Sequence, residues 1–240
     1  MTVGDETQGP RRARRTAERK PRPLWWRVLR GVVIAVVIVA AIPLLLTPLY
    51  RVVAPVSTLM VYERLFGNGA ERDWVTLDQM SPALIRAVVA SEDAFFCRHH
   101  GIDWGAVREV IQAGDSRGAS TIAMQTAKNL FLWPGRSWLR KGLEVPLAWW
   151  ANLTLGKRRL MEVYLNVAEW GPGIFGAGRA AQFHFGVPPD ALTARQAALL
   201  AVTLPDPIGR NPAAPGPGLS ALADRIASRA ADVSCLGLSP

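Results

Sequence analysis

The sequence predicts a mostly α-helical protein with one N-terminal transmembrane helix. The first observation is an uncharged, apolar run over residues 31–50. The second is that apolar residues beyond this run recur three and four positions apart, behind Ser and Thr residues that can cap helices. The third is that no Val, Ile and Thr alternation predicts an extended sheet. The 240 residues therefore have room for an anchor and one sizeable domain.

The apolar run has about the 20-residue length that a helix needs to cross a bilayer. Half of the chain is hydrophobic, at 50%, and the mean hydropathy is +0.13, which is high for a soluble protein. Trp25, Trp26 and Tyr50 stand where aromatic side chains meet the membrane interface. We therefore predict that residues 31–50 are a retained transmembrane anchor.

A buried core helix and a cleavable signal peptide are the alternatives for this run. It is longer than the apolar part of a usual signal peptide, and no small-residue cleavage site precedes Arg51. Pro43 and Pro48 weaken the prediction of an uninterrupted helix.

Residues 1–30 form a basic tail that we expect to be disordered and cytoplasmic. Nine Lys and Arg residues fall within residues 11–30, against one acid, Glu18. The positive-inside rule then places the chain after Arg51 outside the cytoplasm. The tail accounts for much of the net charge of +9 and the pI near 10.5, so we expect no nucleic-acid partner.

The chain has only two cysteines, Cys97 and Cys235, which excludes a disulfide framework and a Cys-rich metal site. A single disulfide between them stays open if the domain lies outside the cytoplasm. The three histidines are scattered and offer no metal-ligand spacing.

A helical domain is predicted over residues 51–212, followed over 213–240 by a linker and a short C-terminal helix. Proline and glycine in residues 211–218 predict a stiff connection before a helix around Leu219 to Val233. Five helix starts are predicted inside the domain: Pro82 behind Ser81, near Ser120, near Ser137, at Lys157, and behind a capping box of Thr193 and Gln196.

Glu92 is the first candidate for chemistry. It continues the helical stripe of Ile85, Val88 and Val89, so its carboxylate points to the core. Burial raises the pKa of such a group toward the range that suits proton transfer. The alternative is a glutamate at a helix end that points to water.

The segment 118–131 is the second candidate. On a helix Thr121, Gln125 and Lys128 share one polar face, and the helix start offers backbone N–H groups to an anion. Helix capping by Ser120 explains the same residues without a ligand.

Cations gather in the third candidate segment. Arg136, Arg140 and Glu144 recur every four residues, and with Lys128 they place several positive charges near one carboxylate. Such a cluster suits a pyrophosphate group. The alternative is an exposed ion pair of Arg140 and Glu144 on a helix surface.

Taken together, these segments resemble the family 51 glycosyltransferases, the peptidoglycan polymerases, and in particular their monofunctional, membrane-anchored branch. The likeness covers about residues 55–210 and rests on four motifs in order. They are Glu92-Asp93-x-x-Phe96-x-x-His99-x-Gly101, Gly118 through Gln125 with Lys128-Asn129-Leu130-Phe131, Arg140-Lys141-x-x-Glu144, and Lys157-x-Arg159 with Glu162-x-Tyr164-Leu165-Asn166.

The resemblance implies a lysozyme-like helical glycosyltransferase domain that polymerises glycan strands from lipid II. Glu92 would take the proton of the acceptor 4-hydroxyl, the donor carbon would invert, and undecaprenyl pyrophosphate would leave with help from Glu144. The implied substrate-binding residues are Asp93, Phe96, His99, Ser120, Thr121, Gln125, Lys128, Asn129, Arg136, Arg140 and Lys141. A divalent cation, Mg²⁺ or Mn²⁺, is compatible with this site without being required, and no organic cofactor is expected.

Two departures from the family pattern stand in the motif regions, and two rival functions stay open. Met124 stands where the family often has Gln, and Pro146 should kink or restart the helix that carries Glu144. The chain leaves no room for a transpeptidase, so other cell-wall synthesis proteins are expected as partners beside the nascent glycan strand. One rival is a lysozyme-like lytic enzyme, and the other is a basic module without activity.

Overall fold

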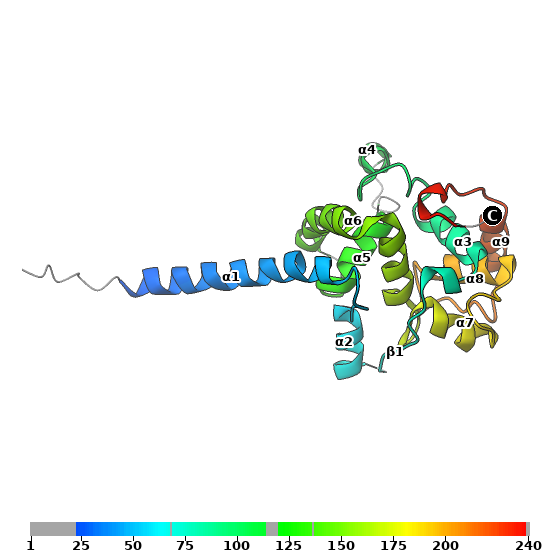
Figure 1. The fold of residues 1–240 in the computed structure, drawn as a ribbon, viewed down its shortest axis with the longest axis horizontal. Coiled ribbons are helices and arrows are strands. Elements are labelled where there is room, and N and C mark those ends of the chain that lie inside the picture. The colour runs from blue at the N-terminus through cyan, green and yellow to red at the C-terminus, as the bar shows by residue number, and fades with distance from the viewer. Residues whose placement is uncertain (1–22, 68, 114–119, 136, 239–240) are drawn as a thin grey trace, which may run out of the picture. The chain divides into compact units, whose positions relative to one another are not determined.

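The computed structural model describes residues 23–67, 69–113, 120–135 and 137–238 (Figure 1). The chain divides into two units, Met1–Ala40 and Ala41–Pro240. The N-terminal helix, α1 (Leu24–Leu49), is long and apolar enough to cross a membrane. It continues through Pro43 and Pro48. Residues 1–22 of the predicted disordered tail lie outside the described residues, and the prediction was wrong for residues 24–30, which form the first turns of α1.

The second unit is mostly helical, as predicted. Its described helices are α2 (Thr58–Phe66), α3 (Pro82–Glu92), α4 (Trp104–Ala113), α5 (Ile122–Phe131), α6 (Trp138–Val167), α7 (Ala177–Phe185), α8 (Ala194–Thr203) and α9 (Pro217–Ala227), with 3-10 turns at Leu77–Gln79 and Ser234–Leu236. The core lies where α5 packs on α6 and where α3 and α9 pack on α8. Tyr164 and Trp170 are among the largest side chains buried there.

A small three-stranded sheet closes one side of this unit. Its strands are β1 (Glu71–Arg72), β2 (Glu169–Gly171) and β3 (Ile174–Phe175), in the order β1-β3-β2. β3 pairs in parallel with β1 and antiparallel with β2, with a register shift between Glu169 and Gly171. The Gly171-Pro172-Gly173 sequence, predicted as a joint, lies at the turn between β2 and β3. Such short strands carry too few residues to show an alternating pattern in sequence.

Local capping signals predicted several helix starts correctly. Ser81 accepts the N–H of Ala83 ahead of α3, and Ser137 accepts that of Arg140 ahead of α6. The capping box of Thr193 and Gln196 is formed at α8. The helix predicted to start near Ser120 begins at Ile122, and its cap is Thr121, so the alternative in which Ser120 is the cap was wrong.

Pro146 does not restart the helix that carries Glu144. α6 continues through it, and the break comes at Gly156, whose φ of +72° lies in the left-handed region that favours glycine. The helix start predicted at Lys157 is therefore the second half of α6.

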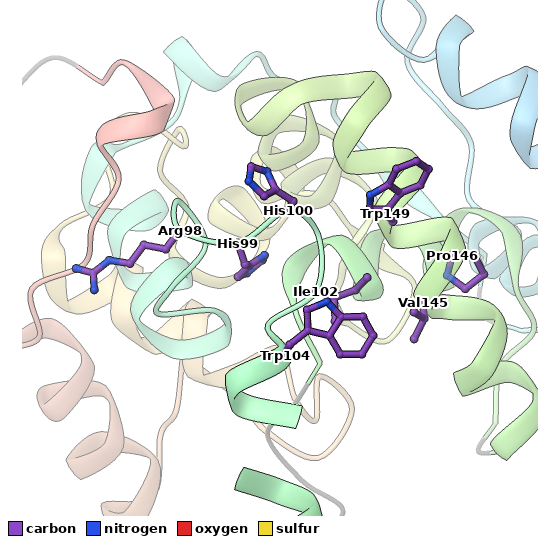
Figure 2. Close-up of a pocket in the computed structure, with 8 residues that line it drawn as sticks. All are labelled: Arg98, His99, His100, Ile102, Trp104, Val145, Pro146 and Trp149. Atoms are coloured by element: carbon purple, nitrogen blue, oxygen red, sulfur yellow. The ribbon is translucent and has the colours of Figure 1, made fainter. Parts of the chain in front are cut away.

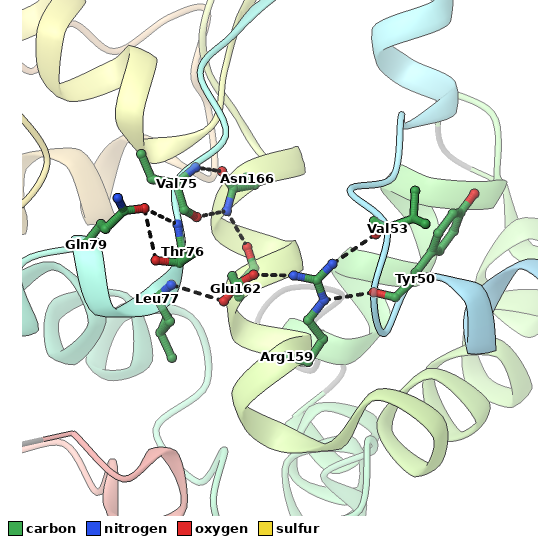
Figure 3. A network of polar contacts seen from close by, with 9 residues as sticks. All are labelled: Tyr50, Val53, Val75, Thr76, Leu77, Gln79, Arg159, Glu162 and Asn166. Atoms are coloured by element: carbon green, nitrogen blue, oxygen red, sulfur yellow. Dashed lines mark hydrogen bonds and ion pairs between the residues drawn. The ribbon is translucent and has the colours of Figure 1, made fainter.

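The fourth sequence motif holds loops onto α6 (Figure 3). Arg159 donates to the backbone oxygens of Tyr50 and Val53, at 2.8 and 2.9 Å. Asn166 exchanges two hydrogen bonds with the backbone of Val75, and Glu162 accepts the N–H of Leu77 at 3.1 Å. Arg159, Glu162 and Asn166 therefore have a structural role, since they fix two loops against α6.

Tyr50 does not take the interfacial position that its place beside the apolar run suggested. Its ring is buried and stacks on Phe131, with 6.0 Å between the ring centroids. Thr47 is also buried and Leu46 packs against the core, so the domain already packs over the last residues of the apolar run.

The C-terminal segment returns to the loop after α3. α9 begins at Pro217, inside the region predicted as linker, and buries Ala223 and Ile226. Beyond it, Cys235 forms a disulfide with Cys97, with 5.5 Å between their Cα atoms. The pairing that the sequence left open is present.

The disulfide accounts for both cysteines of the chain. We therefore expect no reactive thiol in folded, unreduced protein and two per chain after reduction in denaturant, as counted with a chromogenic thiol reagent. Two reactive thiols before reduction would contradict the bond.

Gly101 is predicted to be intolerant of a side chain. Its φ is +97°, and a Cβ there would lie 2.9 Å from the carbonyl oxygen of Ala148. Gly101→Ala should lower the free energy of unfolding by about 1 to 3 kcal/mol, measured by denaturant titration in detergent. The control is Gly142→Ala, where a Cβ meets nothing within 4 Å, and it should raise stability by up to about 1 kcal/mol. Equal stability of the two variants would contradict the close approach of Gly101 to Ala148.

Candidate active site

Glu92 ends α3 with its carboxylate held by two side chains. Ser91 Oγ donates to Oε1 at 3.0 Å, and Gln125 Nε2 donates to Oε2 at 3.0 Å. The hydroxyl of Tyr164, which is completely buried, donates to Oε1 of Gln125 at 3.1 Å. A relay from the core through α5 therefore fixes the orientation of the Glu92 carboxylate.

Burial raises the pKa of Glu92 above the ordinary value for a glutamate, because the anion loses hydration. The hydrogen bonds from Gln125 and Ser91 and the charges of Lys128 and Arg210 act in the opposite direction without cancelling the effect. The alternative of a glutamate that points to bulk water was wrong. Glu92 instead lines a pocket of about 250 Å³ together with Asp103, Ser120 and Arg229.

Asp93 joins the end of α3 to the start of α5. Its Oδ2 accepts the N–H of Ile122 at 2.9 Å, and its Oδ1 lies 2.8 Å from His99 Nε2. Because His99 Nδ1 accepts the N–H of Gly101, Nε2 carries the proton and donates to Asp93. Thr121 donates to the oxygen of Gly101 at 2.6 Å and accepts the N–H of Met124.

These contacts give several residues of the first two motifs a role within the fold, and the substrate contacts predicted for Asp93, His99 and Thr121 stay predictions. Phe96 is completely buried, so its side chain cannot touch a substrate here. Lys157 lies 4.4 Å from the centre of its ring and donates to the oxygen of His99 at 2.6 Å. Asp93, His99 and Thr121 hold the loop through their polar atoms, and Asp93 and Thr121 also line the pocket of Glu92. We assign Phe96 and these three residues to positioning the loop that follows Glu92.

Glu144 is the centre of a buried group of cations. Its side chain is 3% exposed; Lys141 Nζ lies 2.9 Å from Oε2, and Arg140 lies 3.4 Å from Oε1. The alternative of an exposed ion pair was therefore wrong. Lys141 also donates to Ser120 Oγ, which lines the pocket of Glu92.

Lys128 interacts electrostatically with both carboxylates of the site, Glu92 and Glu144. Burial lowers its pKa most, and the charges of Arg140 and Lys141 lower it further, while Glu144 and Glu92 act in the opposite direction. Within the described part of the chain, its ammonium makes no hydrogen bond or ion pair. Nor does the buried Nε of Arg140 have a hydrogen-bond partner among those residues. Three cations with one carboxylate in contact leave a positive excess that favours an anion.

Two other predicted contacts remain open or unsupported. Arg136 lies outside the described residues, as do Gly118 and Ala119 of the second motif. Asn129 is buried, and its backbone oxygen accepts the hydroxyl of Thr58 at 3.1 Å. Met124 is buried in the core, so no polar contact is missing at its position.

Sequence reasoning missed three residues near Glu92. Tyr164 stands in the fourth motif, and only its phenol could have suggested a polar partner in the core. Arg210 affects the pKa of Glu92, and Arg229 lines its pocket, but both follow the four motifs in sequence. Their distance along the chain concealed their closeness in space.

A second pocket, of about 680 Å³, lies between the loop after α3 and the first half of α6 (Figure 2). Its walls are largely apolar, with Ile102 and Trp104 facing Val145, Pro146 and Trp149. Among the residues that the structure describes, no carboxylate lines it. It therefore lacks a base of the kind that Glu92 provides.

The side chains of the site do not suit a resident metal ion. In the part of the chain that the structure describes, no group of three His, Cys, Asp or Glu residues could hold one. Glu144, the carboxylate nearest the cations, has both oxygens paired with Lys141 or Arg140. Its donor set does not fit a divalent cation.

Comparisons with known proteins agree with this arrangement. Residues 59–233 match the family model described as Transglycosylase. The chain is 51% identical to the biosynthetic peptidoglycan transglycosylase of Nitrobacter hamburgensis over 87% of this chain and 96% of that protein. It is 54% identical to the protein of that name from Mesorhizobium japonicum, over 87% and 93%. By the family match and these identities, the chain belongs to the transglycosylase family and is a peptidoglycan glycosyltransferase.

Proposed function

We propose that the enzyme extends glycan strands from lipid II, with Glu92 as the general base and with pyrophosphate as the leaving group's charged part. One observation carries the proposal: Glu92 lies half-buried in a pocket whose wall residue, Ser120, also touches the cation group around Glu144. One reaction centre can therefore be served by a base on one side and by positive charge on the other.

In the proposed step, Glu92 takes the proton of the acceptor's 4-hydroxyl as this oxygen attacks the donor's anomeric carbon. The new C–O bond forms as the bond from that carbon to the phosphate oxygen breaks, with inversion. The bonding pair leaves with the pyrophosphate, and the proton stays on Glu92. The raised pKa of Glu92 suits it to accept a proton near neutral pH.

The cations stabilise the charge that develops on the leaving group. Lys128, whose ammonium makes no bond to the described residues, is available for phosphate oxygens, and Lys141 reaches from Glu144 toward the pocket. In many enzymes such preorganised charge is the largest single contribution to the stabilisation of the transition state. Glu144 holds the cations in place. A divalent cation stays a prediction that no step of this mechanism uses.

The proposed location is the bacterial inner membrane. α1 is the anchor, the basic residues before it stay in the cytoplasm, and the catalytic domain faces the periplasm. This topology brings the domain to a lipid-linked substrate. Other cell-wall synthesis proteins are proposed as partners for cross-linking. The lytic alternative is less well supported, because cleavage of finished glycan needs no cations for pyrophosphate.

Glu92→Gln should abolish polymer formation. The amide keeps the size of the side chain but cannot take a proton, so we expect a loss of at least about 100-fold in kcat, measured on purified enzyme with lipid II. Muramidase sensitivity identifies the product. Glu109→Gln, on the exposed face of α4, is the control and should keep full activity. Undiminished polymerisation by Glu92→Gln would refute the assignment, and a chelator arm tests the divalent cation.

The pH dependence should respond to the relay through Gln125. Its hydrogen bond lowers the pKa of Glu92, so Gln125→Leu should raise that pKa further. Glu92 acts as a base only when it is ionised, so kcat falls as the pH decreases. In Gln125→Leu this fall should begin at a higher pH than in the wild-type enzyme. Tyr164→Phe should shift this acid limb in the same direction, and Gln112→Leu, on an exposed position of α4, should not. An acid limb that stays in place or moves to lower pH in Gln125→Leu would contradict the relay.

A further inference from the structure

The segment that follows α9 crosses the loop after the catalytic base. We call residues 228–238 the C-terminal strap. Its Cys235 is bonded to Cys97, and Asp232 lies 3.8 Å from Arg98 in an ion pair. Leu236 is buried, and Arg158 of α6 donates to its backbone oxygen at 2.6 Å. The strap is therefore fastened both to the catalytic loop and to the core.

The first turn of the strap brings a cation to the catalytic pocket. Arg229 lines the pocket of Glu92, on a backbone fixed by its N–H bond to the oxygen of Ile226 at 3.1 Å. Its side chain is exposed and makes no ion pair or hydrogen bond to the described residues. A guanidinium held at the rim of a pocket without a protein partner is available to a ligand.

Arg229 is distinct from the other cations near Glu92. The cations that act on the pKa of Glu92 are Lys128 and Arg210, and Arg229 is not one of them. It also stands apart from the cations around Glu144, which reach this pocket through Ser120. Among the described residues, Arg229 is therefore the one cation in the lining of the pocket, and Lys141 lies behind the wall residue Ser120.

We propose that Arg229 is a further substrate-binding residue, which takes an anionic oxygen pair of the lipid-linked substrate inside the Glu92 pocket, and that the Cys97–Cys235 disulfide holds it there. Two parts of such a substrate share this chemistry: the diphosphate and the carboxylates of the peptide. A planar guanidinium binds either of them through two parallel hydrogen bonds. The inference rests on the proposed function, since it takes the same pocket as the place of reaction.

The test is steady-state kinetics on the full-length enzyme with lipid II. Arg229→Ala should raise KM by about tenfold or more, since a charge-assisted contact is lost, and should leave kcat and the acid limb of the pH profile unchanged. Arg229→Lys should recover part of the loss. The matched control is Arg225→Ala, an exposed arginine in the last turn of α9, which should behave like the unchanged enzyme.

The fastening is tested by replacing both cysteines with serine. In the Cys97→Ser/Cys235→Ser enzyme, Arg229→Ala should raise KM by a smaller factor than in the disulfide-bonded enzyme, because the guanidinium is already misplaced. An equal factor in both backgrounds would overturn the role of the disulfide. Thermal unfolding checks that the double serine variant is folded. If it is not, Arg229→Ala and Arg229→Lys in the disulfide-bonded enzyme decide the role of Arg229.

A substrate arm separates the two sources of the anion. If the KM effect of Arg229→Ala disappears with lipid II whose peptide carboxylates are amidated, the peptide is the ligand. If the effect persists, the diphosphate is. If the wild-type enzyme polymerises lipid II and Arg229→Ala has the same KM, this inference is refuted and the proposed function is not. Failure of the unchanged enzyme to polymerise lipid II would instead refute the proposed function.

Discussion

The site depends on the two hydrogen bonds of one buried carboxylate, Asp93. One oxygen accepts the first N–H of α5, and the other accepts the proton of His99. The residue immediately before it is the base, Glu92, and α5 carries Gln125 and Lys128. A single side chain therefore sets the position of the base against the helix that orients its carboxylate. Both partners pair with an anion in a poorly hydrated place, where such bonds are strong.

Residues with local signals could be predicted from the sequence. Ser81 and the Thr193 capping box mark helix starts because a cap needs only its own next few residues. The inward direction of Glu92 followed from helical spacing, and the cations near Glu144 followed from a repeat of four residues. Each of these inferences uses contacts within about two turns of one helix, where periodicity is informative.

The role of individual motif residues could not be predicted in the same way. Phe96 and Thr121 belong to two motifs that resemble a binding site, yet Phe96 is completely buried and the hydroxyl of Thr121 bonds within the fold. Tyr164 and Arg229 reach Glu92 or its pocket from segments far along the chain. Such placements depend on tertiary packing, which no local pattern records.

The glycine break inside α6 has a mechanical consequence. The half before Gly156 carries Glu144 and Lys141, and the half after it carries Tyr164, which reaches the base through Gln125. Along α6, the cation group around Glu144 and the relay to Glu92 are therefore connected through Gly156, whose φ is +72°. Open space surrounds this glycine, so a larger residue would fit by volume and still be disfavoured by its backbone. A small rotation there would mistune the reaction while every reacting group stayed chemically intact.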